Sequence, residues 1–140
     1  MIDVQLRSLT DIQLAECFET VSMEAGKHKG DWDNRIIDRL VSKQFNIWKE
    51  LERRGPQSLG LLLPLLDHPD HWVRCTTAAV CLSLDRQRCV AMLRALYEAM
   101  DGLVSAEACF YLLAHDPEFR AEYEAYAHAK YGHGSPDEGH

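Results

Sequence analysis

The side chains that could do chemistry in this sequence are two histidines and a cysteine close together, His68, His71 and Cys75. His71 and Cys75 are four residues apart, so on a helix both would face one metal ion. A structural zinc site needs four protein ligands, and no second Cys or His pair is near. A thiol beside a histidine, with Asp70 close by, is also a pattern for nucleophilic catalysis. A purely structural role explains the same residues equally well, with the two histidines in a turn and the cysteine in the core.

The sequence contains no Gly-rich phosphate loop, no GxSxG elbow, no HExxH and no dinucleotide-binding fingerprint. We therefore predict no catalytic residue, no metal and no cofactor, and expect a binding protein.

Charge is distributed unevenly. Nine acidic residues and only two basic ones follow Tyr97, whereas the preceding residues balance, so the net charge of -7 belongs to the C-terminal third. Nucleic-acid binding needs clustered Lys and Arg, so this pattern argues against it and favours a basic protein partner. A solvated acidic surface that only aids solubility would look the same. The predicted contact residues are Asp101, Glu107, Asp116, Glu118 and Glu122, with Tyr111, Tyr123 and Trp72.

Trp32 and Trp72 both stand where a loop meets a helix. Tryptophan in that position serves either as a binding anchor or as a lid on the core. The tyrosines are open to the same two interpretations, because packing between the last two helices would also explain them.

Length and composition indicate one globular domain over residues 1–132. No apolar run approaches the ~20 residues of a membrane span, and the first residues lack the apolar segment of a signal peptide. A cytoplasmic protein without a membrane partner is expected. The five cysteines are odd in number and mostly lie in apolar helical runs, which indicates reduced thiols.

Apolar residues recur at helical spacing, and no stretch alternates long enough to predict a strand. We expect an all-α fold of about seven helices in antiparallel hairpins. Residues 10–55 form an N-terminal pair, 57–84 a hairpin with a kink or 3₁₀ turn at Pro64, 85–114 a second hairpin, and 117–132 a capping helix. The polar segment 133–140 is expected to be disordered.

The two hairpins resemble each other at a shift of 31 residues. Leu62 then falls on Leu93 and Val73 on Val104, with apolar residues meeting at every inward position. Stacked hairpins of this kind form a short α-solenoid. Any two amphipathic hairpins match to some extent, because both obey the same helical period.

The segment from Leu66 to Arg74, LDHPDHWVR, resembles the turn of HEAT repeats. The resemblance implies that Asp67 and Arg74 link successive units, that Pro69 shapes the turn and that Val73 packs in the core. Residues 10–100 also resemble a family of small bacterial all-helical proteins of unassigned function, through the Leu51–Gly55 motif LERRG and the Leu-Asp-His-Pro turn. Some small HEAT-like bacterial proteins are immunity proteins that neutralise a toxin.

The sequence thus favours a protein-binding module, most concretely an immunity protein that holds a toxin against its acidic C-terminal face. An adaptor subunit of a larger assembly is the second hypothesis, and a metal or thiol enzyme that uses His68, His71 and Cys75 is the third.

Overall fold

The computed structural model describes residues 2–132, and these residues form helices, turns and loops without a strand. The elements are α1 Ile2–Arg7, α2 Asp11–Lys27, α3 Arg35–Arg54, α4 Pro56–Leu59, the 3₁₀ helix η1 Gly60–Asp67, α5 His71–Val80, α6 Arg86–Glu98, α7 Gly102–His115 and α8 Pro117–Tyr131. The predicted all-α fold is confirmed. The tail predicted to be disordered, 133–140, lies outside the described residues. Within the described part of the chain, no helix is long and apolar enough to cross a membrane.

Capping side chains set the start of several helices. Thr10 and Gln13 form a complete capping box at α2. Asp70 accepts hydrogen bonds from the backbone N–H groups of Trp72 and Val73, and Asp85 accepts one from Arg88. Each side chain satisfies N–H groups that the first turn of a helix leaves free.

Three elements differ from the prediction. The sequence analysis overlooked the short helix α1. The 3₁₀ turn predicted at Pro64 is present but longer than expected, because it runs as η1 over Gly60–Asp67 and leaves only α4 of the helix expected from residue 57. Pro64 cannot donate the backbone hydrogen bond that an α-helix needs there. Helix α5 ends at Val80 instead of Leu84, and a tight turn follows it.

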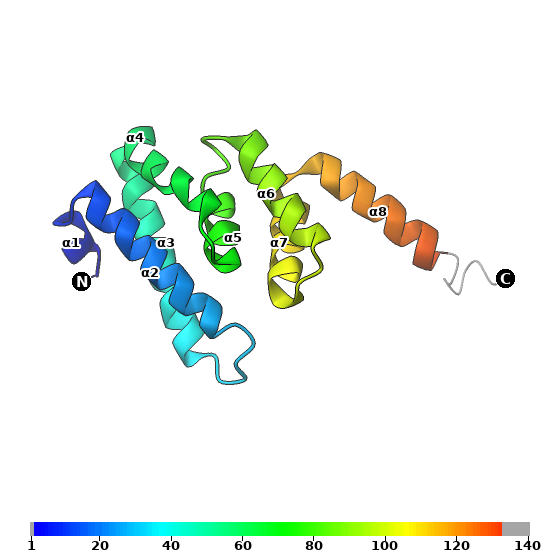
Figure 1. The fold of residues 1–140 in the computed structure, drawn as a ribbon, viewed down its shortest axis with the longest axis horizontal. Coiled ribbons are helices and arrows are strands. Elements are labelled where there is room, and N and C mark those ends of the chain that lie inside the picture. Colours follow the sequence, from blue (N-terminus) through cyan, green and yellow to red (C-terminus); the bar gives the residue numbers. More distant parts are fainter. Residues whose placement is uncertain (1, 133–140) are drawn as a thin grey trace.

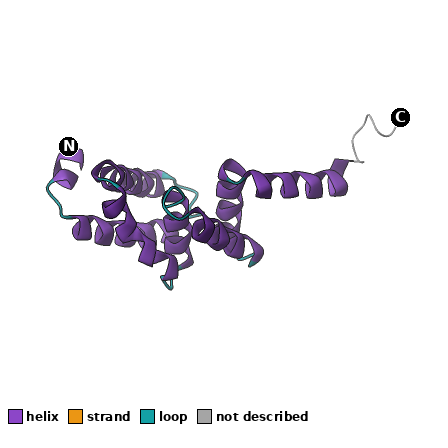
Figure 2. Ribbon diagram, turned by 90° about the horizontal axis from the view of Figure 1, so that it is seen from above, coloured by secondary structure: helices purple, strands orange, loops and turns teal. Residues whose placement is uncertain are grey.

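The helices stand side by side as hairpins in chain order, as Figure 1 shows. Helix α2 packs on α3, η1 on α5, and α6 on α7, while α5 also contacts α2, α6 and α7. Helix α8 packs on α7 and extends away from the remaining helices (Figures 1 and 2). Helix α5 therefore joins the N-terminal helices to the α6–α7 hairpin.

The burial pattern supports the repeat predicted at 31 residues only in part. Four pairs of residues at that shift are at most 1% exposed: Leu62 and Leu93, Val73 and Val104, Thr77 and Ala108, Cys81 and Leu112. Other positions expected to face inward are only partly buried, namely Leu65, Leu82, Val90, Cys109 and Leu113. The identity of the two hairpins as HEAT repeats stays a prediction.

The arginine of the HEAT-like turn acts within its own unit. Arg74 donates hydrogen bonds to the carbonyl oxygens of His68 (2.7 Å) and Pro69 (3.0 Å). Ser105, which replaces it in the second unit, donates to the carbonyl of Tyr97 at 2.7 Å. The predicted role of Arg74 as a link between units is therefore wrong, because its short reach to these carbonyls closes the turn that precedes α5.

The other turn residues divide between core and surface. Val73 is fully buried, as predicted. Asp67 is exposed, and its nearest cation is Arg88 of the next unit at 3.9 Å, so the predicted link between units is reduced to one weak surface pair. Pro69 is exposed at the turn.

A polar cluster joins the N-terminal helices. Arg54 pairs with Glu50 (2.8 Å) and with Asp11 of α2 (2.8 Å), and donates to the carbonyl oxygens of Leu6 and Arg7. Hydrogen bonds from Arg53 and then Arg54 lower the pKa of Glu50 to about 2. These contacts fix α3 against α1 and α2.

Candidate partner-binding groove

The carboxylates predicted to form an acidic face are separated, and three of them are paired within the chain. Glu107 lies 2.8 Å from Lys29, and both side chains are only about one-fifth exposed (21% and 20%). On the opposite side of α7, Arg94 contacts Asp116 (3.5 Å) and Glu122 (3.1 Å). The prediction of one free acidic surface therefore fails for these three residues, because cations distant in sequence already neutralise them.

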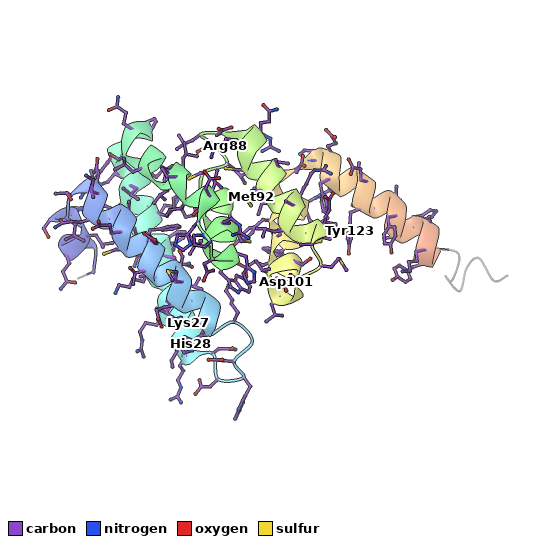
Figure 3. The ribbon with its side chains drawn as sticks, viewed as in Figure 1. Lys27, His28, Arg88, Met92, Asp101 and Tyr123 are labelled. Carbon is purple, nitrogen blue, oxygen red and sulfur yellow. The ribbon has the colours of Figure 1, made fainter. Side chains whose placement is uncertain are left out.

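The remaining predicted acids are open to solvent. Asp101 stands at the α6–α7 turn, 3.4 Å from His71, and faces the same edge of the molecule as the α2–α3 loop (Figure 3). Glu118 is exposed in the first turn of α8, and no cation lies within salt-bridge distance among residues 2–132. Tyr123 is half-buried and stacks on Phe119 with ring centroids 6.0 Å apart, so packing accounts for part of its surface.

Trp72 is a lid on the core, so the prediction of an exposed anchor is wrong for this residue. Its side chain is only 9% exposed, because it packs against Gly26 of α2, and the ammonium of Lys29 lies 5.0 Å from its ring centroid. Trp32, in the α2–α3 loop, is 97% exposed instead.

His68, His71 and Cys75 do not converge on one point. His68 lies 2.8 Å from Glu19, and His71 faces Asp101. Burial raises the pKa of the Cys75 thiol to about 12, so the free thiol is protonated at neutral pH and is a poor nucleophile. No group of three metal-binding side chains occurs in the described chain. The geometry thus gives the metal and thiol hypothesis no support.

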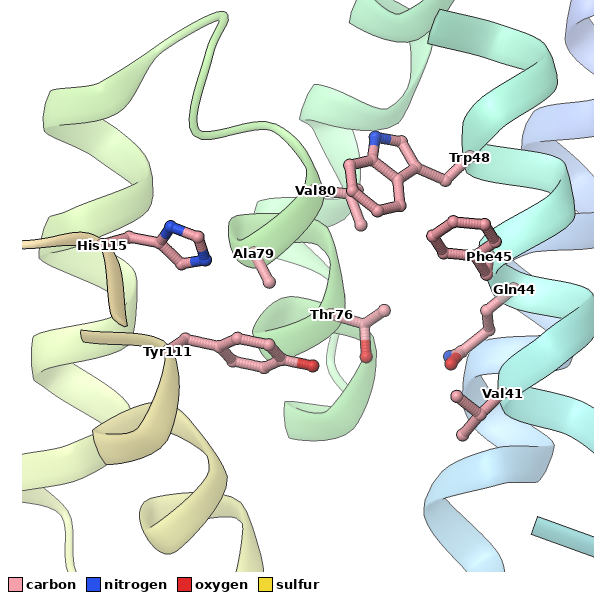
Figure 4. Close-up of a pocket in the computed structure, with 9 residues that line it drawn as sticks. All are labelled: Val41, Gln44, Phe45, Trp48, Thr76, Ala79, Val80, Tyr111 and His115. Atoms are coloured by element: carbon pink, nitrogen blue, oxygen red, sulfur yellow. The ribbon is translucent and has the colours of Figure 1, made fainter. Parts of the chain in front are cut away.

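The structure contains an apolar pocket that the sequence analysis missed, which we call the central groove. Its volume is about 230 Å³, and Figure 4 shows its lining side chains between three helices. They are Val41, Gln44, Phe45 and Trp48 of α3, Thr76, Ala79 and Val80 of α5, and Tyr111 and His115 of α7.

Helix α3 carries two apolar stripes, and only one of them enters the core. Ile47 and Leu51 are fully buried, whereas Val41, Phe45 and Trp48 stand on another side of the helix and line the groove. Phe45 is 50% exposed and meets Trp48 edge to face, with ring centroids 5.6 Å apart. Phe45 therefore presents half of an apolar side chain to solvent at the centre of this wall.

The opposite wall is fixed by an ion pair and a hydrogen bond. Burial raises the pKa of Tyr111, so its phenol is protonated and donates to Glu107 at 3.3 Å. Glu107 in turn holds Lys29 of the α2–α3 loop. Because Lys29 and Glu107 are 78 residues apart, no local pattern predicts this contact.

The polar groups that line the central groove are few: the amide of Gln44, the indole N–H of Trp48, the hydroxyl of Thr76, the phenol of Tyr111 and the imidazole of His115. The amide already donates to Ser22 at 3.1 Å, and the phenol is bound to Glu107. The indole N–H is buried and has no hydrogen-bond partner in the described part of the chain. An apolar surface with a few fixed polar groups is typical of a binding site.

Comparison with known proteins places the chain in one family. No curated protein and no solved structure matches it. The model of a family described as a domain of unknown function, DUF2019, matches residues 12–115. This range runs from the second residue of α2 to the last residue of α7, includes every residue of the central groove and ends before α8. The prediction of a family of unassigned function is thereby confirmed, and the chain belongs to the DUF2019 family.

Proposed function

We propose that this chain is a non-catalytic module that binds another protein and holds a helical segment of that partner in the central groove. The observation that carries the proposal is the aromatic wall of α3. Phe45 and Trp48 face an open space that no other part of the described chain fills. Exposed apolar surface of this kind contributes to binding when a partner covers it.

A helix suits the shape of the groove. Helix α3 packs against α1, α2 and α4 but not closely against α5, so the two leave a trough between them. The floor carries small side chains, Thr76, Ala79 and Val80, and α3 and α7 form the walls. Small residues allow a close approach of another backbone, and an amphipathic helix lying in an apolar groove is a recurring mode of recognition.

The most concrete form of this proposal is that the partner is a basic toxin, whose active surface this protein covers. The net charge of -7 supports a basic partner, because long-range attraction speeds encounter even when individual carboxylates are paired. The toxin assignment rests on the resemblance to HEAT-like repeat proteins, because some small bacterial proteins of that kind are immunity proteins. Occlusion needs an extended surface and no chemistry, which agrees with the mostly apolar lining of the groove.

The test compares two equally simple charge insertions. Phe45→Glu places a carboxylate in the wall of the groove, and Ile12→Glu places one on exposed Ile12 of α2, outside the groove. Both variants should keep the wild-type melting temperature, since both side chains are largely exposed. Immobilised wild-type protein and Ile12→Glu should retain the same partner from the host lysate, and Phe45→Glu should lose it, with affinity more than tenfold weaker.

Co-expression tests the toxin form separately. The retained partner should inhibit growth when produced alone, and wild-type protein but not Phe45→Glu should restore growth. Equal retention of the partner by Phe45→Glu would refute the groove as the binding surface. A partner that is harmless when produced alone would leave a binding module and reject the toxin assignment.

A further inference from the structure

A second apolar recess continues the central groove along α7. This α7 recess has a volume of about 450 Å³ and is lined by Lys29, Gly30, Trp72, Leu103, Ala106, Glu107, Phe110 and Tyr111. Tyr111 also lines the central groove, so the two spaces meet at its ring. A segment that lies in the groove and continues past Tyr111 therefore reaches the recess.

The apolar part of the α7 recess is a single helix stripe. Leu103, Ala106 and Phe110 follow each other at steps of three and four residues, so they share one side of α7. Leu103 is 54% and Phe110 68% exposed, while the opposite side of α7 is buried at Val104 and Ala108. The recess thus offers a partner two large side chains that contribute little to the core.

The electrostatics of the recess are one-sided. Residues 95–119 include no Lys or Arg, and exposed Glu98 and Asp101 stand at the α6–α7 turn, which directly precedes Leu103 of the recess. Lys29 is the cation that lines the recess, and Glu107 neutralises it at 2.8 Å. His71 lies 3.4 Å from Asp101 and is the other titratable group at this turn. The rim therefore complements positive charge.

We infer that the α7 recess receives one end of the partner helix, where an apolar side chain packs on Leu103 and Phe110 and following Lys or Arg residues face Glu98 and Asp101. This inference rests on the proposed function and adds the chemistry of the partner: an apolar helix face with a cationic end.

Two synthetic helical peptides of the same length and with the same Leu/Ala face test the inference. One ends in three Lys residues and the other in three Glu residues, and fluorescence polarisation measures their affinity for the full chain. The Lys peptide should bind roughly tenfold more tightly, because two attractive charge contacts replace two repulsive ones. Raised salt should reduce this preference, because the rim charges are exposed.

Charge-reversal variants locate the preference. Glu98→Lys with Asp101→Lys should abolish or invert the ratio of the two affinities, whereas Glu118→Lys with Glu124→Lys on α8 changes the net charge equally and should keep it. If the wild-type chain bound both peptides equally, and Phe45→Glu bound neither, the inference about charge would be overturned. The central groove would still stand as the helix-binding site. The same ratio in both double variants would also overturn the inference. Binding unaffected by Phe45→Glu, or no binding of either peptide, would reject the proposed helix-binding groove together with the inference.

Discussion

Replacing Gly26 by alanine should destabilise this protein, although the same change usually stabilises a helix. Gly26 lies in the last turn of α2. A Cβ atom there would approach Cδ1, Cγ and Cβ of Trp72 to 2.6, 2.7 and 2.8 Å. These atoms lie near the backbone of Trp72, so rotation of the side chain cannot remove all three contacts.

The magnitude follows from two opposing effects. Alanine in place of glycine in a helix is favourable by roughly 0.5–1 kcal/mol. An extra carbon in a well-packed site costs about 1–3 kcal/mol, because side chains and backbone must shift. The clash involves a buried ring between α2 and α5, so we expect overpacking to exceed the gain, with a net loss of about 1–2 kcal/mol in the free energy of unfolding.

Gly60 supplies the matched control. Its backbone is helical, with φ -61° and ψ -19°, and an added Cβ would meet nothing within 4 Å. Gly60→Ala should therefore raise the free energy of unfolding by a few tenths to about 1 kcal/mol. Urea denaturation followed by circular dichroism measures both variants. Gly26→Ala as stable as the wild type, or more so, would show that Trp72 does not pack on α2 as described.

Two further predictions concern single residues of the scaffold. Because the folded pKa of Glu50 is about 2, below the usual 4.5, its stabilisation is complete above pH 4.5 and is lost as the pH falls towards 2. Glu50→Gln should lower the free energy of unfolding by roughly 2 kcal/mol at pH 7, a figure that allows for solvent screening because Arg53 is exposed. In this variant, stability should decline less between pH 4.5 and pH 2. Met100 follows the last residues of α6 and has a φ of 53°, which is unfavourable for a residue with a side chain. Met100→Gly should therefore stabilise the protein by about 1 kcal/mol in the same urea assay. Unchanged stability would argue against strain at this position.

Local patterns predict the helices well, since local interactions determine where they begin. Thr10, Asp70 and Asp85 cap helices as their spacing indicates. The repeat is predictable in part, because only some equivalent positions of the two hairpins are buried. The short helix α1 was overlooked because the first residues offer few periodic positions, and Arg54 of α3 helps to hold its end through two carbonyl oxygens.

The candidate site was harder to predict, because it depends on contacts between distant segments. Helical spacing assigns Val41 and Ile47 to one apolar series, and only the placement of α2 decides that Ile47 is buried while Val41 lines a groove. Likewise, a sequence shows that Glu107 is acidic but not that Lys29 neutralises it. A helix with more apolar positions than one core stripe needs is the signal that points to such a groove.

The groove is preorganised, which bears on how tightly it can bind. The polar cluster of Arg54 and Glu50 holds the α3 wall to the N-terminal helices, and the Lys29–Glu107 pair ties the loop before α3 to the α7 wall. Because both walls are fixed before a partner arrives, little side-chain or loop ordering opposes binding, and more of the apolar burial appears as affinity. Lys29 joins the two walls without supplying free charge to the site, so its structural value lies in the spacing of the walls, and in the interaction we propose the acidic turn before α7 selects the partner.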